Sequence, residues 1–218
     1  MIIGISGRIY AGKDETAKMI RKLTSIPFNV EDEFGNPAKD EKGDYILDYH
    51  SKWQIKKFAG KLKEIASMLT GFPLDKFEDR DFKASDLPAE WNDKDGNPMS
   101  VRRFLQLLGT ECVRDHLHTN TWVNALFADY WIGSGDPNWI NPNWIITDCR
   151  FPNEYKAIRD RSGIILRVIR DTEDKSIQLH ESETALDNHK FDWYIYNTGD
   201  LNHLQNEVQE FLEQYKLL

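Results

Sequence analysis

An α/β fold, with a parallel sheet flanked by helices, is predicted by two observations. The chain opens with a β-branched apolar run, a glycine-flanked loop and a helix-prone segment at residues 14–23. Further apolar runs at residues 53–59, 143–150, 164–170 and 192–196 predict four more strands. Amphipathic segments that predict helices lie between and after these runs, at residues 62–71, 101–117, 121–131, 152–158 and 201–215. Such alternation is typical of a parallel sheet covered by helices, and 218 residues suffice for one such domain with insertions.

The loop after the first strand fits the phosphate-binding pattern GxxxxGK. Gly7, Gly12 and Lys13 occupy its fixed positions. In such a loop, backbone N–H groups and a helix N-terminus surround a polyphosphate, and the lysine contacts its outer oxygens. The alternative is a glycine-rich turn with a surface lysine, which does not explain why the lysine directly follows the second glycine. The pattern therefore predicts a nucleotide-binding P-loop.

Asp14 stands where this pattern usually has Ser or Thr, whose hydroxyl binds Mg²⁺. A carboxylate is a good ligand for a hard cation, and it also suits the positive end of a helix. Asp14 is therefore either a residue on the magnesium side of the site or a simple first-turn residue. Thr16 is an alternative source of the hydroxyl.

The apolar run at residues 143–150 ends in Asp148 and Arg150. Ligands of open α/β sheets bind beyond the carboxyl ends of the strands. We therefore expect Asp148 near the P-loop, as an acidic residue on the magnesium side. Residues 171–190 are polar and without clear periodicity, and we interpret them as a lid that covers the phosphates.

Polar stretches interrupt the strand and helix pattern. Pro27 is expected to end the first helix, and residues 28–50 and 72–100 are polar and rich in turn-forming residues. This composition predicts surface insertions, with a hairpin in the first. In the helix that begins at residue 101, Arg102 and Arg114 fall away from the apolar face, and solvated arginines are the usual explanation for such a pattern.

The net charge, the apolar runs and the cysteines indicate which binding partners and which cellular compartment to expect. The formal net charge is −8, which argues against a surface that coats nucleic acid. No apolar run reaches the roughly 18 residues that a membrane span needs, and no signal peptide precedes the first strand. We therefore expect a soluble, cytoplasmic protein with no nucleic-acid or membrane partner. Cys112 and Cys149 lack metal-binding spacing, and we interpret both as core residues.

Several segments together resemble the deoxynucleoside monophosphate kinases of tailed bacteriophages. They are SGRIYAGKDETA, KKFAGKLKEIA, MSVRRFLQLLGTE, TWVNALFADYW, TDCRFPNE, LHESE and IYNTGDL. They occur in the family's order and span nearly the whole chain. The resemblance implies one P-loop kinase domain over residues 1–218, with monophosphate-binding helices at about 101–131 and a lid at about 171–190. It also implies transfer of the ATP γ-phosphoryl group to a 2′-deoxynucleoside 5′-monophosphate with Mg²⁺, and a homodimer.

The resemblance assigns a role to each matching position. ATP would be held by Gly7, Gly12, Lys13, Asp14, Glu15, Thr16, Asn197 and Gly199. The monophosphate and its base would be framed by Lys63, Arg80, Arg102, Gln106, Gly109, Thr110 and Trp122, with Asp148 and Arg150 between the two nucleotides. Lys13, Arg150 and Arg170 would act on the transferring group, and Asp14 and Asp148 on the metal ion.

Other functions fit parts of the same pattern. A coenzyme-precursor kinase of the same fold would share the P-loop, but it has no reason to carry VRRFLQLLGT. A P-loop ATPase coupled to movement or assembly would be expected to carry a basic patch or an added nucleic-acid domain. A nucleotide-binding protein without catalysis would not need Lys13, Asp148 and Arg150 together.

Overall fold

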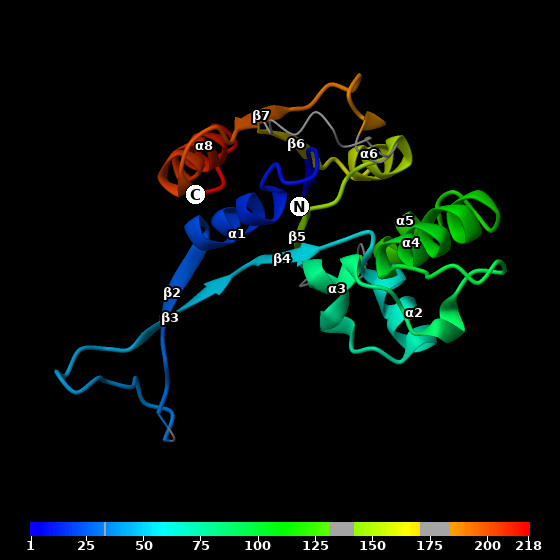
Figure 1. Ribbon diagram of the computed structural model, residues 1–218. Helices are drawn as coiled ribbons and strands as arrows, with labels where there is room; N and C mark the ends of the chain where they lie inside the picture. The colour runs from blue at the N-terminus through cyan, green and yellow to red at the C-terminus, as the bar shows by residue number, and fades with distance from the viewer. Residues whose placement is uncertain (33, 131–141, 171–183) are drawn as a thin grey trace. The chain divides into compact units, whose positions relative to one another are not determined.

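The computed structural model describes residues 1–32, 34–130, 142–170 and 184–218. The chain forms two compact units, which we call the sheet unit and the helical unit. The sheet unit comprises residues 1–55 and 142–218, and the helical unit comprises residues 56–141. Figure 1 shows the elements of both.

The sheet unit is built on a five-stranded sheet in the order β4-β5-β1-β6-β7. Its strands are β1 Ile2–Ser6, β4 Trp53–Lys56, β5 Asn143–Ile146, β6 Ile164–Ile169 and β7 Trp193–Tyr196. β1 pairs in parallel with β5 and with β6, and β6 pairs in parallel with β7. The predicted α/β class is therefore confirmed, since the expected strands form one mostly parallel sheet flanked by helices.

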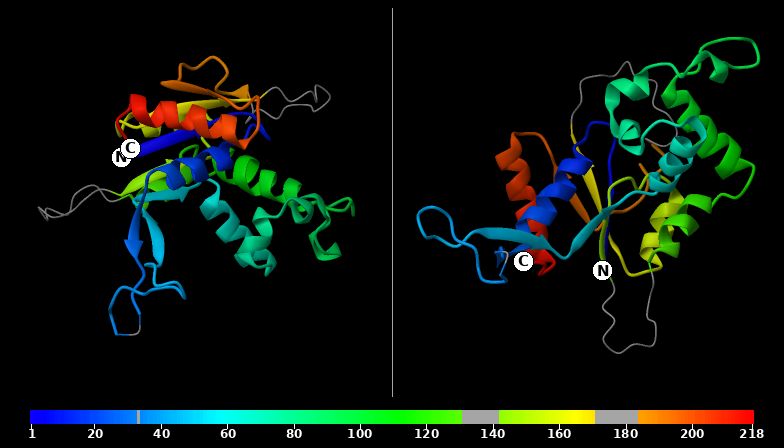
Figure 2. Two further views of the ribbon diagram at one scale, coloured as in Figure 1. Left: turned by 90° about the vertical axis from the view of Figure 1, so that its left-hand side faces the viewer. Right: turned by 90° about the horizontal axis from the view of Figure 1, so that it is seen from below.

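Helices cover this sheet because its central strand is apolar on both faces. Ile3 and Ile5 of β1 are fully buried in a cluster that contains residues of α1 (Lys13–Leu23) and α8 (Leu201–Gln214). Gly4 points the other way, where a Cβ would lie 2.7 Å from Ile158 of α6 (Pro152–Arg159). α1 and α8 pack side by side (Figure 2). A strand buried on both faces is typical of α/β proteins.

The first insertion forms a separate antiparallel ribbon of β2 (Ser25–Asn29) and β3 (Leu47–Ser51). Pro27 lies inside β2 opposite Tyr49, and the preceding helix α1 has already ended at Leu23. The expectation that Pro27 ends the helix was therefore wrong. Proline is compatible with such a position because β2 has a single partner strand, so its other edge needs no ladder donor.

The helical unit contains short helices around a small apolar core. They are α2 Gly60–Thr70, η1 Leu74–Glu78, α3 Arg80–Ala84, η2 Ala89–Trp91, α4 Val101–Gln106, η3 Leu107–Asp115 and α5 Thr121–Ala128. The core consists of Ala66, Phe77, Leu87, Val101 and Phe104. The helices expected at residues 62–71, 101–117 and 121–131 therefore exist among the described residues, although the second is divided into α4 and η3.

The helix that begins at Val101 changes its winding at Leu107. From there to Asp115 it is a π-helix, η3, whose bonds run from residue i to i+5. The wider turn rotates later residues away from the face that regular α-helical spacing predicts. Cys112 is therefore exposed and Arg114 is buried, so the expectations of a core cysteine and a solvated arginine were both wrong. Cys149 is buried, as expected.

Gly109 and Trp122 hold the π-helix against its neighbours. A Cβ at Gly109 would lie 2.7 Å from Leu62 of α2, so glycine permits this close packing. The indole N–H of Trp122 on α5 donates to the carbonyl of Gly109 at 2.8 Å. Trp122 is 5% exposed. The hydrogen bond therefore gives a buried backbone oxygen of η3 a donor from α5 in addition to its helical one.

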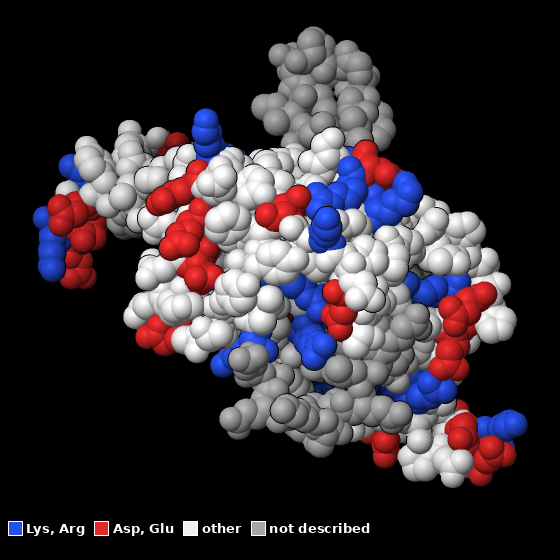
Figure 3. All heavy atoms as spheres, turned by 90° about the horizontal axis from the view of Figure 1, so that it is seen from above, with Lys and Arg blue, Asp and Glu red and all other residues white. Residues whose placement is uncertain are grey.

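Basic and acidic side chains alternate in small groups on the face shown in Figure 3. Within the described ranges, no helix combines the length and the apolar character that a membrane span requires.

Trp122→Phe tests the role of this indole in the helical unit. The substitution removes the indole donor to the buried Gly109 carbonyl, which should lower the free energy of unfolding by about 0.5–1.5 kcal/mol, the net value of one hydrogen bond. Thermal and urea unfolding measure the change. Trp91→Phe is the control, because Trp91 packs against Phe104 at a centroid distance of 5.0 Å in the same unit. An equal fall in the free energy of unfolding in the two variants would show that the smaller ring, and not the lost hydrogen bond, causes the destabilisation.

Candidate functional site

The parallel sheet brings several of the expected site residues to one edge. The P-loop follows β1, Asp148 and Arg150 follow β5, and Asn197 follows β7. Because these strands run in the same direction as β6, all their carboxyl ends lie at the same edge. Arg170 follows β6 directly and is exposed there.

The P-loop folds around its own lysine. Gly12 has φ 98° and forms the N-cap of α1, whose first residue is Lys13. The Lys13 ammonium donates to the carbonyls of Gly7 and Arg8, each at 2.7 Å. The positive φ of Gly12 disfavours any residue with a side chain. The loop therefore presents a half-buried ammonium and a helix N-terminus together, which is an anion-binding arrangement.

Two close contacts explain why the loop uses glycine. A Cβ at Gly7 would lie 2.7 Å from the carbonyl oxygen of Val168, and one at Gly12 would lie 2.4 Å from Nδ2 of Asn197. That amide donates to the carbonyl of Ala11 at 2.9 Å, and Asn197 is 6% exposed. Asn197 thus supports the P-loop backbone from β7. Two residues later, Gly199 lies exposed, before the N-terminus of α8.

The three residues after Lys13 differ in their exposure and in their hydrogen-bond partners. Asp14 is exposed in the first turn of α1. Glu15 pairs with Lys18 at 3.3 Å along the same helix. Thr16 is fully buried, and its hydroxyl donates to the carbonyl of Gly12 at 3.0 Å. Asp14 is therefore better placed than Thr16 to meet a metal ion from solvent.

A magnesium ion fits this donor set when phosphate oxygens complete it. Mg²⁺ usually takes one or two carboxylates together with substrate phosphates and water. Asp14 and the half-buried Asp148 supply such carboxylates. Within the described residues, no group of three or more His, Cys, Asp or Glu side chains forms a protein-only metal site.

The segment after β5 is held rigidly beside β1. The backbone N–H of Cys149 donates to the carbonyl of Ile5 at 3.2 Å. The carboxylate of Glu154, which is 3% exposed, accepts from the N–H groups of Arg150 at 2.8 Å and Phe151 at 3.0 Å. Burial raises the pKa of the Cys149 thiol well above its usual value, and the charge of Glu154 raises it further. Cys149 therefore stays a neutral core thiol.

In the helical unit, lysines converge on one glutamate. Lys63 of α2 pairs with Oε1 of Glu78 at 2.6 Å, and Lys57 pairs with Oε2 at 3.5 Å. The Lys63 side chain is 12% exposed. Burial raises the pKa of Glu78, but the hydrogen bond and charge of Lys63 outweigh it and hold that pKa below its usual value.

Lys83 of α3 and Arg102 of α4 extend this cluster of positive charge. Burial lowers the pKa of Lys83 from its ordinary value, and the charge of Lys63 lowers it further. Glu78 raises it, whereas Arg102 and Lys57 lower it. We call Lys57, Lys63, Lys83, Arg102 and Glu78 the lysine cluster. Because cations outnumber the carboxylate and repel one another, the cluster suits an anion.

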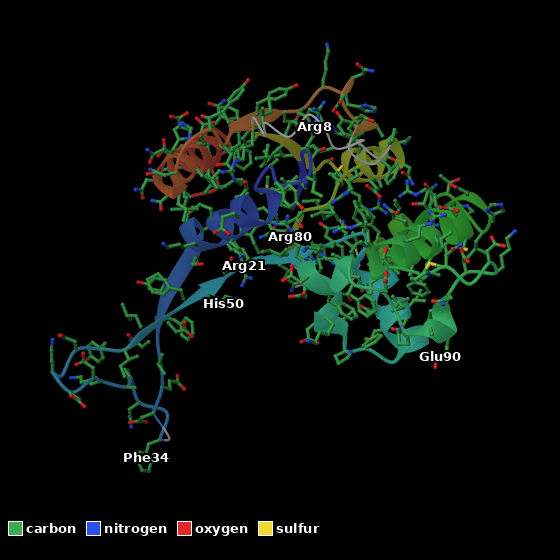
Figure 4. All side chains as sticks on the ribbon, in the orientation of Figure 1. Arg8, Arg21, Phe34, His50, Arg80 and Glu90 are labelled. Atoms are coloured by element: carbon green, nitrogen blue, oxygen red, sulfur yellow. The ribbon has the colours of Figure 1, made fainter. Side chains whose placement is uncertain are left out.

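Other residues expected around the monophosphate have different surroundings. Arg80 is exposed at the start of α3 (Figure 4). Gln106 and Thr110 are half-buried on either side of the change from α- to π-helix. Gly109 and Trp122 are buried in the packing of η3. Sequence reasoning missed Lys57, Lys83 and Glu78, although Lys57 lies in KKFAGKLKEIA, a segment that carried the resemblance.

The chain is similar to known kinases of bacteriophages. It matches the family described as deoxynucleotide monophosphate kinase over residues 46–208. A deoxynucleoside-5′-monophosphate kinase of Escherichia phage T5 is 25% identical over 98% of this chain and 96% of its own length. Deoxynucleotide monophosphate kinases of Escherichia phage RB69 and Enterobacteria phage T4 are 29% and 30% identical over 52% of this chain, and over 45% and 46% of their own lengths. The T5 match includes the P-loop, which precedes the family match.

Glu78→Gln tests whether the lysine cluster shares one electrostatic environment. Because Glu78 raises the pKa of Lys83, its neutralisation should lower that pKa further. An NMR titration of the lysine side chains measures it. Glu64→Gln is the control, since Glu64 pairs with Lys61 at 3.1 Å on α2. An unchanged Lys83 pKa in Glu78→Gln, or an equal fall in the control, would contradict a shared cluster.

Proposed function

Because the chain belongs to the deoxynucleotide monophosphate kinase family, we propose that it uses ATP to phosphorylate 2′-deoxynucleoside 5′-monophosphates to diphosphates through the residues described above. It is a phosphotransferase. The observation that best supports the detailed proposal is that the chain carries two distinct anion-binding arrangements. They are the P-loop of the sheet unit and the lysine cluster of the helical unit. A kinase needs both, one for the donor and one for the acceptor.

In the proposed mechanism, the sheet unit binds the donor. Gly7, Gly12 and Lys13 hold the ATP phosphates, and Lys13 exchanges its loop carbonyls for phosphate oxygens. Arg150 and the exposed Arg170 offer further cations at the same edge of the sheet. Asp14 and Asp148 would hold Mg²⁺, which neutralises charge on the phosphates when it is bound. Asn197 keeps the loop in shape through its hydrogen bond to Ala11.

The helical unit binds the acceptor monophosphate in this mechanism. Lys57, Lys63, Lys83 and Arg102 surround the phosphate with positive charge, while Glu78 balances part of that charge in its absence. Phosphoryl transfer requires mainly that the two reactants are positioned and that cations neutralise the transferring group. A covalent intermediate on the protein is therefore unnecessary. The proposed homodimer rests on the family resemblance alone, and sedimentation equilibrium would test it.

A coenzyme-precursor kinase and a motor-type ATPase are less well supported. An ATPase needs one nucleotide site and leaves the lysine cluster without a role. A coenzyme-precursor kinase would use a cationic acceptor site, but the family match and the phage relatives are named for deoxynucleotide substrates.

A product analysis tests the proposed reaction. The protein is incubated with ATP, Mg²⁺ and each deoxynucleoside monophosphate, and dNDP, ADP and free phosphate are separated by ion-exchange chromatography. We expect dNDP and ADP in equal amounts. Lys13→Ala should lower kcat by at least about two orders of magnitude, because the cation nearest the donor phosphates is removed. Free phosphate without dNDP would overturn the proposed reaction, and normal turnover of Lys13→Ala would exclude the P-loop mechanism.

Substitutions of two neighbouring arginines on α4 test the proposed acceptor site. Arg102→Ala should raise KM for the monophosphate by about 10- to 100-fold, the cost of losing a hydrogen bond to a charged group, and leave KM for ATP unchanged. Arg103→Ala is the control, because Arg103 already pairs with Glu111. Steady-state kinetics with each substrate varied in turn measure both constants. Equal effects of the two substitutions, or an effect confined to ATP, would contradict the assignment of Arg102.

A further inference from the structure

The arginine of the P-loop, Arg8, is held by a carboxylate from a distant part of the chain. Its Nη2 donates to Oδ2 of Asp187 at 3.1 Å, across a sequence separation of 179 residues. Oδ1 of the same carboxylate accepts from Nη2 of Arg167 at 2.5 Å. Arg167 lies on β6, and its Nη1 donates to the hydroxyl of Ser6 at 3.0 Å. Because Ser6 directly precedes Gly7, the network begins and ends at the P-loop.

Asp187 is presented by a folded turn. The preceding residue, Leu186, is 1% exposed, and the N–H of Asp187 donates to the carbonyl of Thr184 at 2.9 Å. The carbonyl of Lys190 accepts from the hydroxyl of Tyr155 on α6 at 2.5 Å. Residues 184–190 belong to the segment that the sequence suggested as a lid, and residues 171–183 of that segment lie outside the described residues. The carboxylate therefore stands at a fixed place in the sheet unit.

The two arginines on Asp187 have different surroundings. The Arg167 side chain is 12% exposed, uses both terminal nitrogens in the network and lies over the ring of Phe191 at 5.4 Å. The Arg8 side chain is 52% exposed, and its bond to Asp187 uses one of its five N–H donors. Arg167 is thus an anchor, whereas Arg8 retains exposed donors. Figure 4 marks Arg8 on the loop after β1.

The charges around Arg8 favour a phosphate ligand. Two guanidinium groups share one carboxylate, so one positive charge is left over beside the loop. The carbonyl of Arg8 accepts from the Lys13 ammonium at 2.7 Å, which places the two cationic residues at the same turn of the loop. A guanidinium can offer two parallel N–H groups to a phosphate. Holding a flexible side chain in place beforehand also reduces the entropy lost on binding.

We propose that Arg8 is a second phosphate-binding cation of the P-loop, and that Asp187 is the positioning residue that holds its guanidinium ready for the donor. This inference rests on the proposed function, because it takes the ligand of the loop to be a nucleoside triphosphate. Asp187 acts through Arg8 and touches no reacting atom.

A double-mutant cycle tests the proposal. Arg8→Ala, Asp187→Asn and the double variant are compared with the parent for the ATP dissociation constant by calorimetry, and for KM and kcat where turnover is measurable. Arg8→Ala should weaken ATP binding by about 10- to 100-fold. Asp187→Asn should weaken it by about 2- to 10-fold, the cost of ordering one long side chain. Asp187→Asn should have no further effect when Arg8 is already alanine. KM for the monophosphate should stay unchanged.

Asp160→Asn is the matched control, since Asp160 pairs with Lys156 at 2.6 Å on the exposed surface of α6. It should bind ATP like the parent. An unchanged ATP dissociation constant in Arg8→Ala would overturn the ligand role. Tighter binding in Asp187→Asn would show that the carboxylate competes with phosphate, and a loss that persists in the Arg8→Ala background would show that it acts through Arg167. Either result overturns the positioning role.

The calorimetric measurement separates this inference from the proposed function. If the parent forms no dNDP from ATP and any monophosphate, the proposed reaction fails, yet the ATP dissociation constants still test Arg8 and Asp187. If the parent forms dNDP and the cycle shows no coupling, the inference alone fails.

Discussion

Parallel pairing of β1 with β5 on one side and β6 on the other is the constraint on which the candidate donor site depends. β1 is buried along its whole length, so a shift of one residue in its register would move Gly4 away from Ile158 and bring isoleucine side chains into that space. Since the same pairing fixes the carboxyl end of each strand, the packing of apolar residues also decides where the P-loop, Asp148 and Arg170 lie. Core packing and the site are therefore not independent.

The sequence predicted this part of the fold well because its signals are local. A β-branched run, a glycine pattern and helical spacing each lie within a few residues, and they identified every strand of the sheet. The π-helix was missed for the opposite reason. Gly109 faces Leu62, and Trp122 donates to the Gly109 carbonyl, so the winding of η3 accompanies contacts with other helices. Nothing in the spacing of VRRFLQLLGT reveals those contacts, and Cys112 and Arg114 were assigned to the wrong surroundings as a result.

In the candidate site, too, local sequence signals could be recognised, whereas contacts between distant segments could not. The P-loop lysine could be found from its motif, and Asp148 from its place after a strand. Arg8 and Lys57 lie in segments that the sequence analysis had identified. The spacing of charged residues along the sequence does not reveal, however, which residue each of them pairs with. The pairing of Arg8 with Asp187 spans 179 residues, and that of Lys63 with Glu78 depends on how η1 packs against α2. Only the folded chain shows which carboxylate meets which cation.

Each unit places one carboxylate among cations, Asp187 in the sheet unit and Glu78 in the helical unit. In the proposed function these cations bind phosphate, and while no ligand is present they repel one another, which opposes folding. A single carboxylate in each cluster reduces the repulsion, yet leaves an excess of positive charge for the ligand. Both carboxylates remain partly exposed, at 31% for Asp187 and 53% for Glu78, so water weakens these ion pairs. In the proposed function, a phosphate would bind the remaining N–H donors of these cations, so their ion pairs with the carboxylates need not break.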